Sequence, residues 1–150
     1  MAKLRLIRTD ERKIEEGVWV KYLDDIELCI ASTDNAAFVE HKNRLLRPHI
    51  RDMRAKQAVN DNAAVADIVN EAIKPAVARD ILRGWKNIQD DDGKDIPYAP
   101  QTALDFFRQP SMRDLYKFIL EFATEVQNFR QELLEEAEKN LSPSSNGVSP

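Results

Sequence analysis

The sequence predicts an α+β fold that is predominantly α-helical, with a small N-terminal antiparallel β-hairpin or sheet, about four helices and a disordered C-terminal tail. Residues 1–31 contain short segments rich in β-branched and aromatic side chains, whereas residues 36–139 place apolar residues three and four positions apart. With 43% hydrophobic and 32% charged residues, the chain is typical of a folded protein with a charged surface. At 150 residues it has room for one domain, which we expect to span residues 1–139.

The β-rich N-terminal part contains three strand-like segments, at residues 3–8, 17–22 and 26–30. Residues 23–25, Leu-Asp-Asp, are the expected tight turn between the second segment and the third. The resulting hairpin has one apolar face, made of Val18, Val20, Tyr22, Ile26, Leu28 and Ile30. Such a face needs a cover, which the helices that follow can supply.

The first helix is predicted to begin near Ala36, directly after the helix-capping side chains of residues 32–35. It runs towards Arg54, and Pro48 should kink or split it because proline lacks the amide hydrogen that a helix interior needs. Its basic cluster consists of Lys42, Arg44, Arg47, Arg51, Arg54 and Lys56. These cations form either a solvated helix face or a contact for an acidic partner or a phosphate.

The second helix restarts at Asp61-Asn62 and carries apolar residues at helical spacing as far as Leu82, so it should belong to the core. Pro75 interrupts this pattern. Gly84 is expected to end the helix, because glycine adopts the left-handed conformation of a helix C-terminus at little cost. Residues 85–98 then form a turn-rich loop with an acidic tip and apolar residues at both ends.

Two further helices complete the predicted fold. Pro100 suits the first turn of a short apolar helix that stops before Pro110. Residues 111–114 resemble a capping box, and the helix that they open can continue to about Lys139. Residues 140–150 have no periodicity and are rich in serine, so they are predicted to be a disordered tail.

Charge and composition disfavour several classes of protein. The formal net charge is -4 and the sequence pI is about 5.3, so no global positive field exists to attract nucleic acid. A single cysteine, Cys29, excludes an internal disulfide and fits a reducing cytosol. The longest apolar runs fall far short of the ~20 residues that span a bilayer, so we expect no membrane association.

No motif for catalysis or for a metal site emerges from the sequence. Residues 90–93, Asp-Asp-Asp-Gly, resemble part of a calcium loop, but Ile88 and Ala99 would then occupy the first and twelfth positions, where carboxylates are needed. His41 and His49 have no second ligand three or four residues away, and we expect both on the surface. We therefore predict a protein that is not an enzyme and that carries no metal and no cofactor.

The last predicted helix has an apolar stripe at heptad spacing. Its first half is expected to pack on the protein's own core. Its second half continues beyond what so small a domain readily covers, so we expect an exposed surface for a partner or a second subunit. The predicted partner-binding residues are Leu115, Ile119, Phe122, Val126, Phe129 and Leu133.

Residues 77–130 also contain an ordered series of short features. A helix runs into Gly84 and Trp85, an acidic loop contains Gly93, and an apolar-Pro-aromatic step follows at Pro97 and Tyr98. The next helix carries Phe106 and Phe107 before Pro110. In this order and spacing, the features resemble the tail assembly chaperones of long-tailed bacteriophages. The sequence departs from that family at Ala99, where the family often has Ser or Thr.

The resemblance implies a non-enzymatic protein that binds and solubilises the tape measure protein and helps recruit tail tube protein during tail assembly. It further implies a homo-oligomer, a frameshift-extended form of the same chain, a location in the host bacterial cytoplasm and absence from the mature virion. One alternative is a virion structural subunit, such as a tail or head-tail connector component. A second is a DNA-contacting regulator that uses the basic residues between Lys42 and Lys56.

Overall fold

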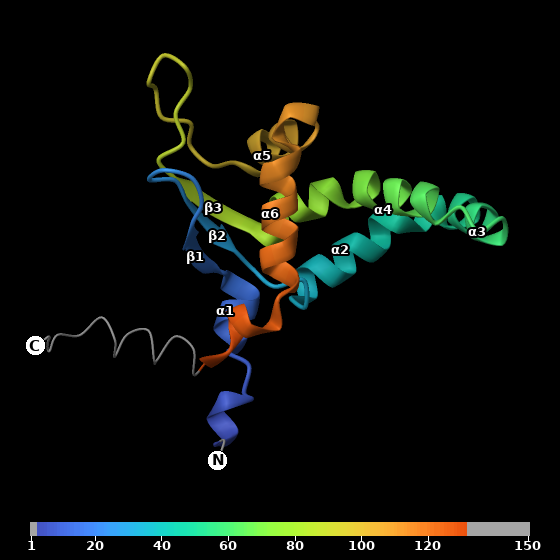
Figure 1. The fold of residues 1–150 in the computed structure, drawn as a ribbon, viewed down its shortest axis with the longest axis horizontal. Helices are drawn as coiled ribbons and strands as arrows, with labels where there is room; N and C mark the ends of the chain where they lie inside the picture. Colours follow the sequence, from blue (N-terminus) through green and yellow to red (C-terminus); the bar gives the residue numbers. More distant parts are fainter. Residues whose placement is uncertain (1–2, 132–150) are drawn as a thin grey trace, which may run out of the picture.

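The structure, a computed structural model, describes residues 3–131 and confirms the predicted α+β class (Figure 1). A three-stranded antiparallel sheet lies beside a set of helices, and α6 crosses the sheet on one face. No helix in the described range is long and apolar enough to cross a membrane. The elements, in chain order, are α1 Glu11–Glu16, β1 Val18–Lys21, β2 Glu27–Ile30, α2 Ala36–Leu46, α3 Ile50–Ala58, α4 Asn62–Ala76, β3 Leu82–Lys86, α5 Pro100–Phe107 and α6 Arg113–Thr124.

The predicted hairpin is confirmed as β1 and β2. Val20 pairs with Leu28, and Val18 pairs with Ile30, so the expected apolar side chains share one face of the sheet. The helices and the loop after β3 cover this face, and Leu28 and Ile30 are completely buried.

The prediction that a helix ends at Gly84 and that a loop begins at Trp85 is wrong, because Leu82–Lys86 form the third strand. β2 has a second edge that needs hydrogen-bond partners, and β3 supplies them, with Trp85 opposite Leu28. Gly84 lies opposite Cys29, and a side chain at this glycine would meet the Trp19 indole at 3.5 Å. The preceding helix ends instead in a π-helical turn, Val77–Ile81.

The prediction of a strand over residues 3–8 is also wrong. Residues Leu4–Leu6 form a 3-10 turn, and α1 follows, although the sequence pattern did not indicate it. The Asp10 carboxylate begins this helix by accepting the amides of Arg12 and Lys13 at 3.0 and 3.4 Å. This cap accounts for the start of α1, whereas the 3-10 turn at Leu4–Leu6 has no side-chain cap.

The helices α2, α3 and α4, residues 36–76, form an arm that projects from the body of the molecule (Figure 1). Asn35 caps α2 as the sequence predicts, and Asp61 caps α4 at the predicted helix start. Pro48 splits the first helix as expected, through a 3-10 turn at Arg47–His49. The interruption predicted at Pro75 is wrong, because Pro75 lies in the last turn of α4 and the helical backbone continues past it into the π-helical turn.

The continuous helix predicted from Ser111 to Lys139 is wrong within the described range. The capping box is not formed: a 3-10 turn, Pro110–Met112, precedes α6, whose start carries no side-chain cap. The helix ends at Thr124, because a second 3-10 turn, Val126–Phe129, folds the chain back onto α1. The predicted helix beyond residue 131 and the predicted tail lie outside the described residues.

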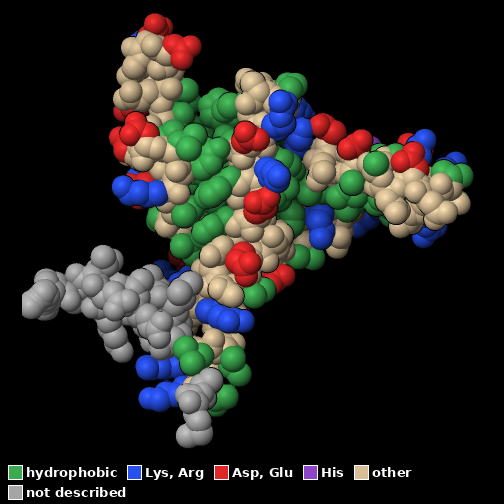
Figure 2. Space-filling view, viewed as in Figure 1, with side chains coloured by type: hydrophobic (Ala, Val, Ile, Leu, Met, Phe, Trp, Pro, Cys, Tyr) green, Lys and Arg blue, Asp and Glu red, His purple; other side chains and the backbone are tan. Residues whose placement is uncertain are grey.

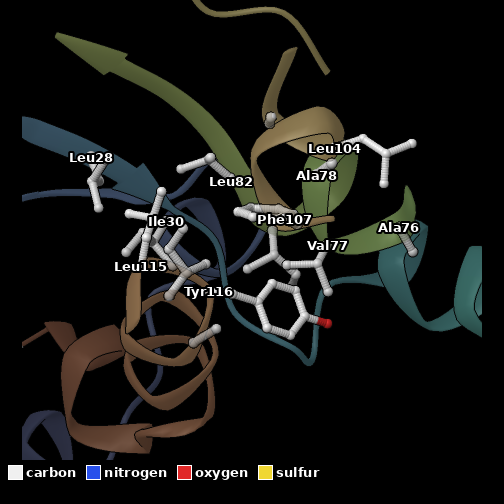
Figure 3. Packing of buried hydrophobic residues seen from close by; sticks show 14 of the residues in the cluster. Leu28, Ile30, Ala76, Val77, Ala78, Leu82, Leu104, Phe107, Leu115 and Tyr116 are labelled. Carbon is white, nitrogen blue, oxygen red and sulfur yellow. The ribbon is translucent and has the colours of Figure 1, made fainter. Parts of the chain in front are cut away.

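The hydrophobic core fills the space between the sheet, α5, α6 and the π-helical turn (Figure 3). Phe107 of α5 contacts Tyr116 of α6 edge to face, with ring centroids 5.0 Å apart. The core also contains Leu28, Ile30, Ala76, Val77, Ala78, Ile81, Leu82, Leu104, Leu115 and Ile119.

Candidate partner-binding groove

An apolar groove of about 350 Å³ lies where the β1–β2 turn, the end of β3 and the start of α6 meet. This volume falls within the usual range for binding pockets. Its lining is mainly aliphatic and aromatic: Tyr22, Leu23, Ile26, Ile88, Phe106, Ser111, Met112, Asp114 and Leu115.

The hairpin turn forms one wall of the groove. Tyr22 and Ile26 close this turn, with the Tyr22 amide donating to the Ile26 carbonyl at 2.9 Å. Asp24 adopts a left-handed conformation with φ 53°, and Leu23 is left 61% exposed. The Asn87 side chain donates to the Asp25 carbonyl at 2.8 Å, which ties the turn to the end of β3. The wall is thus held in place by two hydrogen bonds to backbone carbonyls, one from the Tyr22 amide and one from the Asn87 side chain.

An aromatic cluster of Trp85, Tyr98 and Phe106 supports the groove from behind. The Trp85 ring stacks on Phe106 with centroids 5.4 Å apart and meets Tyr98 edge to face at 5.1 Å. The Trp85 indole donates to the Ile96 carbonyl at 2.6 Å, which holds the loop after β3 against the body. These contacts fix the orientation of Phe106, whose side chain is half-buried and lines the groove.

The Tyr98 hydroxyl lies 2.7 Å from the Ala78 carbonyl and 2.6 Å from the Leu82 carbonyl. Burial raises the pKa of Tyr98 to about 12; the nearby Arg83 opposes the rise, and Asp80 and Cys29 add to it. This tyrosine therefore acts as a neutral hydrogen-bond donor that joins the loop to the π-helical turn and β3.

A row of aromatic rings extends the apolar surface from the groove along α6. Tyr22 contacts Phe118 at 4.8 Å, Phe118 stacks near Phe122 at 6.4 Å, and Phe122 contacts Phe129 at 6.0 Å. Figure 2 shows hydrophobic side chains gathered between α6 and the hairpin. Phe118 and Phe122 are half-buried, so the surface that a partner can reach extends beyond the groove as far as Phe122, whereas Phe129 at the end of the row is buried.

Acidic residues stand at the margin of this surface. Asp114 lines the groove, and its charge adds to burial in raising the pKa of Tyr22. Asp24 and Asp25 are exposed in the hairpin turn, directly after Leu23. Figure 2 also shows acidic side chains at the tip of the loop after β3, where residues 90–95 contain four Asp and one Lys.

The predicted partner-binding residues differ in how far the structure buries them. Leu115 and Ile119 are buried in the core, as expected for the first half of the stripe. The exposure predicted for Phe129 is wrong, because the chain turns back after Thr124 and leaves its side chain 2% exposed. Phe122 is half-buried and Val126 is 57% exposed. Leu133 lies outside the described residues.

Of the residues that carry the resemblance to tail chaperones, only Phe106 lines the groove. Trp85 and Tyr98 support the groove, and Phe107 lies in the core. Gly93, with φ 82°, allows the sharp turn at the loop tip, where nothing else approaches. The remaining three are Gly84 on β3, the exposed Pro97 and Pro110, which opens the 3-10 turn before α6.

Sequence reasoning missed the hairpin contribution to the groove. It assigned Tyr22 and Ile26 to a face that the helices would cover, and it treated Leu23 only as a turn residue. The available signal was Leu23 itself, since a large apolar side chain at a tight turn is unusual beside two aspartates. The groove forms because residues more than sixty positions apart meet there.

The other polar clusters have structural roles. One Asp90 carboxylate oxygen accepts the amides of Asp92 and Lys94, both at 2.9 Å, so this aspartate organises the loop turn.

His41 was expected on the surface, but its Nδ1 lies 2.8 Å from the buried Asp80 carboxylate. His49 is exposed, as predicted. Within residues 3–131, no group of three or more candidate ligands could hold a metal ion.

Cys29 of β2 is buried, with its thiol 3.4 Å from the Glu16 carbonyl. Burial raises the pKa of this thiol, although Arg83 and Lys86 oppose the rise. A raised pKa leaves little thiolate near neutral pH, which agrees with a packing role rather than a reactive one.

Comparison with protein-family models matches residues 33–140, more than two thirds of the chain, to a family described as YdaY prophage protein. The chain belongs to the YdaY prophage protein family. It is therefore a phage-derived protein. No curated protein and no solved structure matches the chain significantly.

The match to the YdaY prophage family begins just before α2 and covers the arm, β3, α5 and α6. The groove residues Ile88, Phe106 and Met112 lie inside the matched region, whereas Tyr22 and Leu23 precede it. The groove is thus built jointly by the family region and by the hairpin that comes before it.

Proposed function

We propose that this chain is a phage tail assembly chaperone. In this role it binds the tape measure protein, keeps it soluble and helps recruit tail tube protein in the host cytoplasm. The observation that carries the proposal is the apolar groove, since a helical client can place its apolar side chains there. The phage origin and the series of motif residues around the groove support the same assignment.

The geometry favours reversible binding over catalysis. The groove offers apolar and aromatic contact area, and its titratable lining groups are Tyr22 and Asp114. Reversible binding of a client needs neither a nucleophile nor a base. We therefore propose that the protein has no enzymatic activity, no cofactor and no metal. We also propose that the chain forms homo-oligomers and that a frameshift-extended form of it exists.

Co-expression with the tape measure protein of the same phage tests the proposal. The wild-type chain should keep the client in the soluble fraction and co-purify with it. Leu23→Asp and Met112→Asp should abolish both effects, because each places a charge in the groove. Ile7→Asp is the matched control, since it adds the same charge to an exposed apolar residue that lies outside the groove lining and outside the predicted partner-binding residues.

Two results would contradict the proposal. If the groove variants are folded by thermal melting and still hold the client as well as the wild type does, the groove is not the client site. If mass spectrometry finds the chain in purified virions, the alternative of a virion structural subunit replaces that of a chaperone.

A further inference from the structure

The corner between α5 and α6 is hollowed on a second side, away from the groove. Phe106 and Leu115 line the groove, whereas their neighbours in sequence, Phe107 and Tyr116, line a separate hollow of about 210 Å³. This hollow is bounded by α4 on one side and by the end of α5 and the start of α6 on the other. The same corner of the chain therefore contributes to two different surfaces.

Three cations from different elements surround this hollow. Lys74 lies in the last turn of α4, Arg108 directly follows α5, and Arg113 begins α6. Within the described residues of the lining, Glu71 is the one carboxylate, so three positive charges and one negative charge leave a formal net charge of +2. Figure 2 shows Lys and Arg side chains gathered at the α5–α6 corner, near the top of the view. A positive hollow contrasts with the formal net charge of -4 of the whole chain.

The two arginines keep hydrogen-bond donors for a ligand. The Arg108 side chain is exposed and forms no hydrogen bond or ion pair within residues 3–131. Arg113 donates through Nη1 to the Pro110 carbonyl at 2.9 Å, which holds the guanidinium in place while its other N–H groups stay available.

Lys74 is held inside the hollow, but its partner is not. The ammonium contacts the Glu71 carboxylate and lies 5.7 Å from the centroid of the Tyr116 ring. The Lys74 side chain is only 14% exposed, whereas that of Glu71 is 69% exposed. A mostly solvated carboxylate gains little from such a pair, so a better anion can replace it.

Aromatic rings form the floor of the hollow. Phe107 and Tyr116 are both buried and contact each other edge to face, with ring centroids 5.0 Å apart. The Tyr116 hydroxyl donates to the Asn70 carbonyl at 3.4 Å, which joins this floor to α4. Since the rings exclude water from one side, an anion above them is attracted to the cations more strongly than it would be in open water.

We propose that this hollow is an oxyanion-binding site, which takes the phosphate or carboxylate group of a ligand. The N–H groups of a guanidinium match two oxygens of either group, and the Lys74 ammonium adds a compact positive charge. The bound anion replaces Glu71 as the partner of Lys74 and so links α4 to the α5–α6 corner. This site is separate from the groove, and the proposal does not depend on client binding.

Titration with sodium phosphate, which replaces sodium chloride at constant ionic strength and neutral pH, tests the proposal. Nuclear magnetic resonance should show saturable shifts for Lys74 and for residues 107–116. Arg108→Gln and Lys74→Met should each weaken binding about tenfold, because each removes a charge-assisted hydrogen bond. Glu71→Gln should bind phosphate more tightly than the wild type, because Lys74 loses its competing carboxylate. Arg12→Gln on α1 is the matched control and should bind as the wild type does.

A parallel titration with sodium acetate identifies the group that the site takes. Saturation by both anions means that a carboxylate suffices, and saturation by one of them alone assigns the site to that group. The proposal is overturned if neither anion produces saturable shifts. It is also overturned if Arg108→Gln and Lys74→Met, shown to be folded by thermal melting, bind like the wild type, or if Glu71→Gln binds no more tightly.

Discussion

Asn35 shows how one buried side chain joins two parts of the fold. Its Oδ1 accepts the Phe38 amide at 2.9 Å and so caps α2. Its Nδ2 donates to the Ser32 carbonyl at 2.7 Å and to the Asp80 carbonyl at 3.0 Å. The residue is 2% exposed, so water cannot replace these bonds once the side chain is removed.

We expect Asn35→Ala to lower the free energy of unfolding by about 2–3 kcal/mol, because it removes a cap and leaves buried carbonyls unpaired. Asp61→Ala is the matched control, since Asp61 caps α4 from an exposed position through one bond to Ala64. It should cost about 1 kcal/mol. Urea unfolding of the two variants measures the difference, and equal losses would show that the contacts to Ser32 and Asp80 contribute nothing.

The raised pKa of Tyr98 predicts a change in the stability of the protein at alkaline pH. Its pKa is about 12 in the folded protein and about 10 in an unfolded chain. The folded state therefore holds the Tyr98 proton more tightly than the unfolded state does. The resulting contribution to stability is complete below pH 10 and is lost as pH rises towards 12. Tyr116, whose pKa is also raised by burial, acts in the same direction.

We expect the free energy of unfolding to fall between pH 10 and 12, and Tyr98→Phe to make this fall shallower while lowering stability at pH 7 by about 1 kcal/mol. Urea unfolding at a series of pH values measures both effects. An unchanged pH dependence in the variant would show that the Tyr98 proton is not linked to folding.

At the scale of the elements, the arm differs from the body in its packing. α3 has no buried residue, whereas Leu28 and Ile30 of β2 are completely buried. Local opening requires less free energy where few apolar contacts must be broken. The arm should therefore open independently of the sheet.

Hydrogen exchange measures this difference directly. At low protein concentration, we expect the amides of α3 to exchange about tenfold faster, or more, than those of β2. Equal protection of α3 and β2 in dilute solution would contradict the view of the arm as weakly packed.

At the scale of the whole molecule, Phe129 joins the two ends of the described chain. Its carbonyl accepts the Asp10 amide at 2.8 Å, and the neighbouring Arg130 carbonyl accepts the buried Lys13 ammonium at 2.7 Å. The Phe129 side chain is 2% exposed, whereas Val126 in the same turn is 57% exposed. The C-terminal turn is thus part of the folded unit.

We expect Phe129→Ala to cost about 3–5 kcal/mol in unfolding free energy, because removing a buried aromatic ring leaves a cavity. Val126→Ala, the matched control, should change it by less than about 0.5 kcal/mol. Thermal and urea unfolding of both variants provide the comparison. Similar stability of the two variants would mean that the turn is not docked on α1.

The sequence by itself determined the fold class, the hairpin, the capped starts of α2 and α4, the break at Pro48 and the start of α5. These features depend on signals within a few residues, such as a capping side chain, a missing amide or an alternation of apolar residues.

Only the tertiary structure decided the third strand, the end of α6 and the groove. Leu82–Lys86 became a strand because the open edge of β2 required partners, which helix periodicity does not reveal. Phe129 became buried because α1, more than a hundred residues earlier, lies beside it. The groove joins Leu23 to Met112 in the same way. Contacts between residues so distant in sequence depend on the packing of the whole chain, which no local pattern encodes.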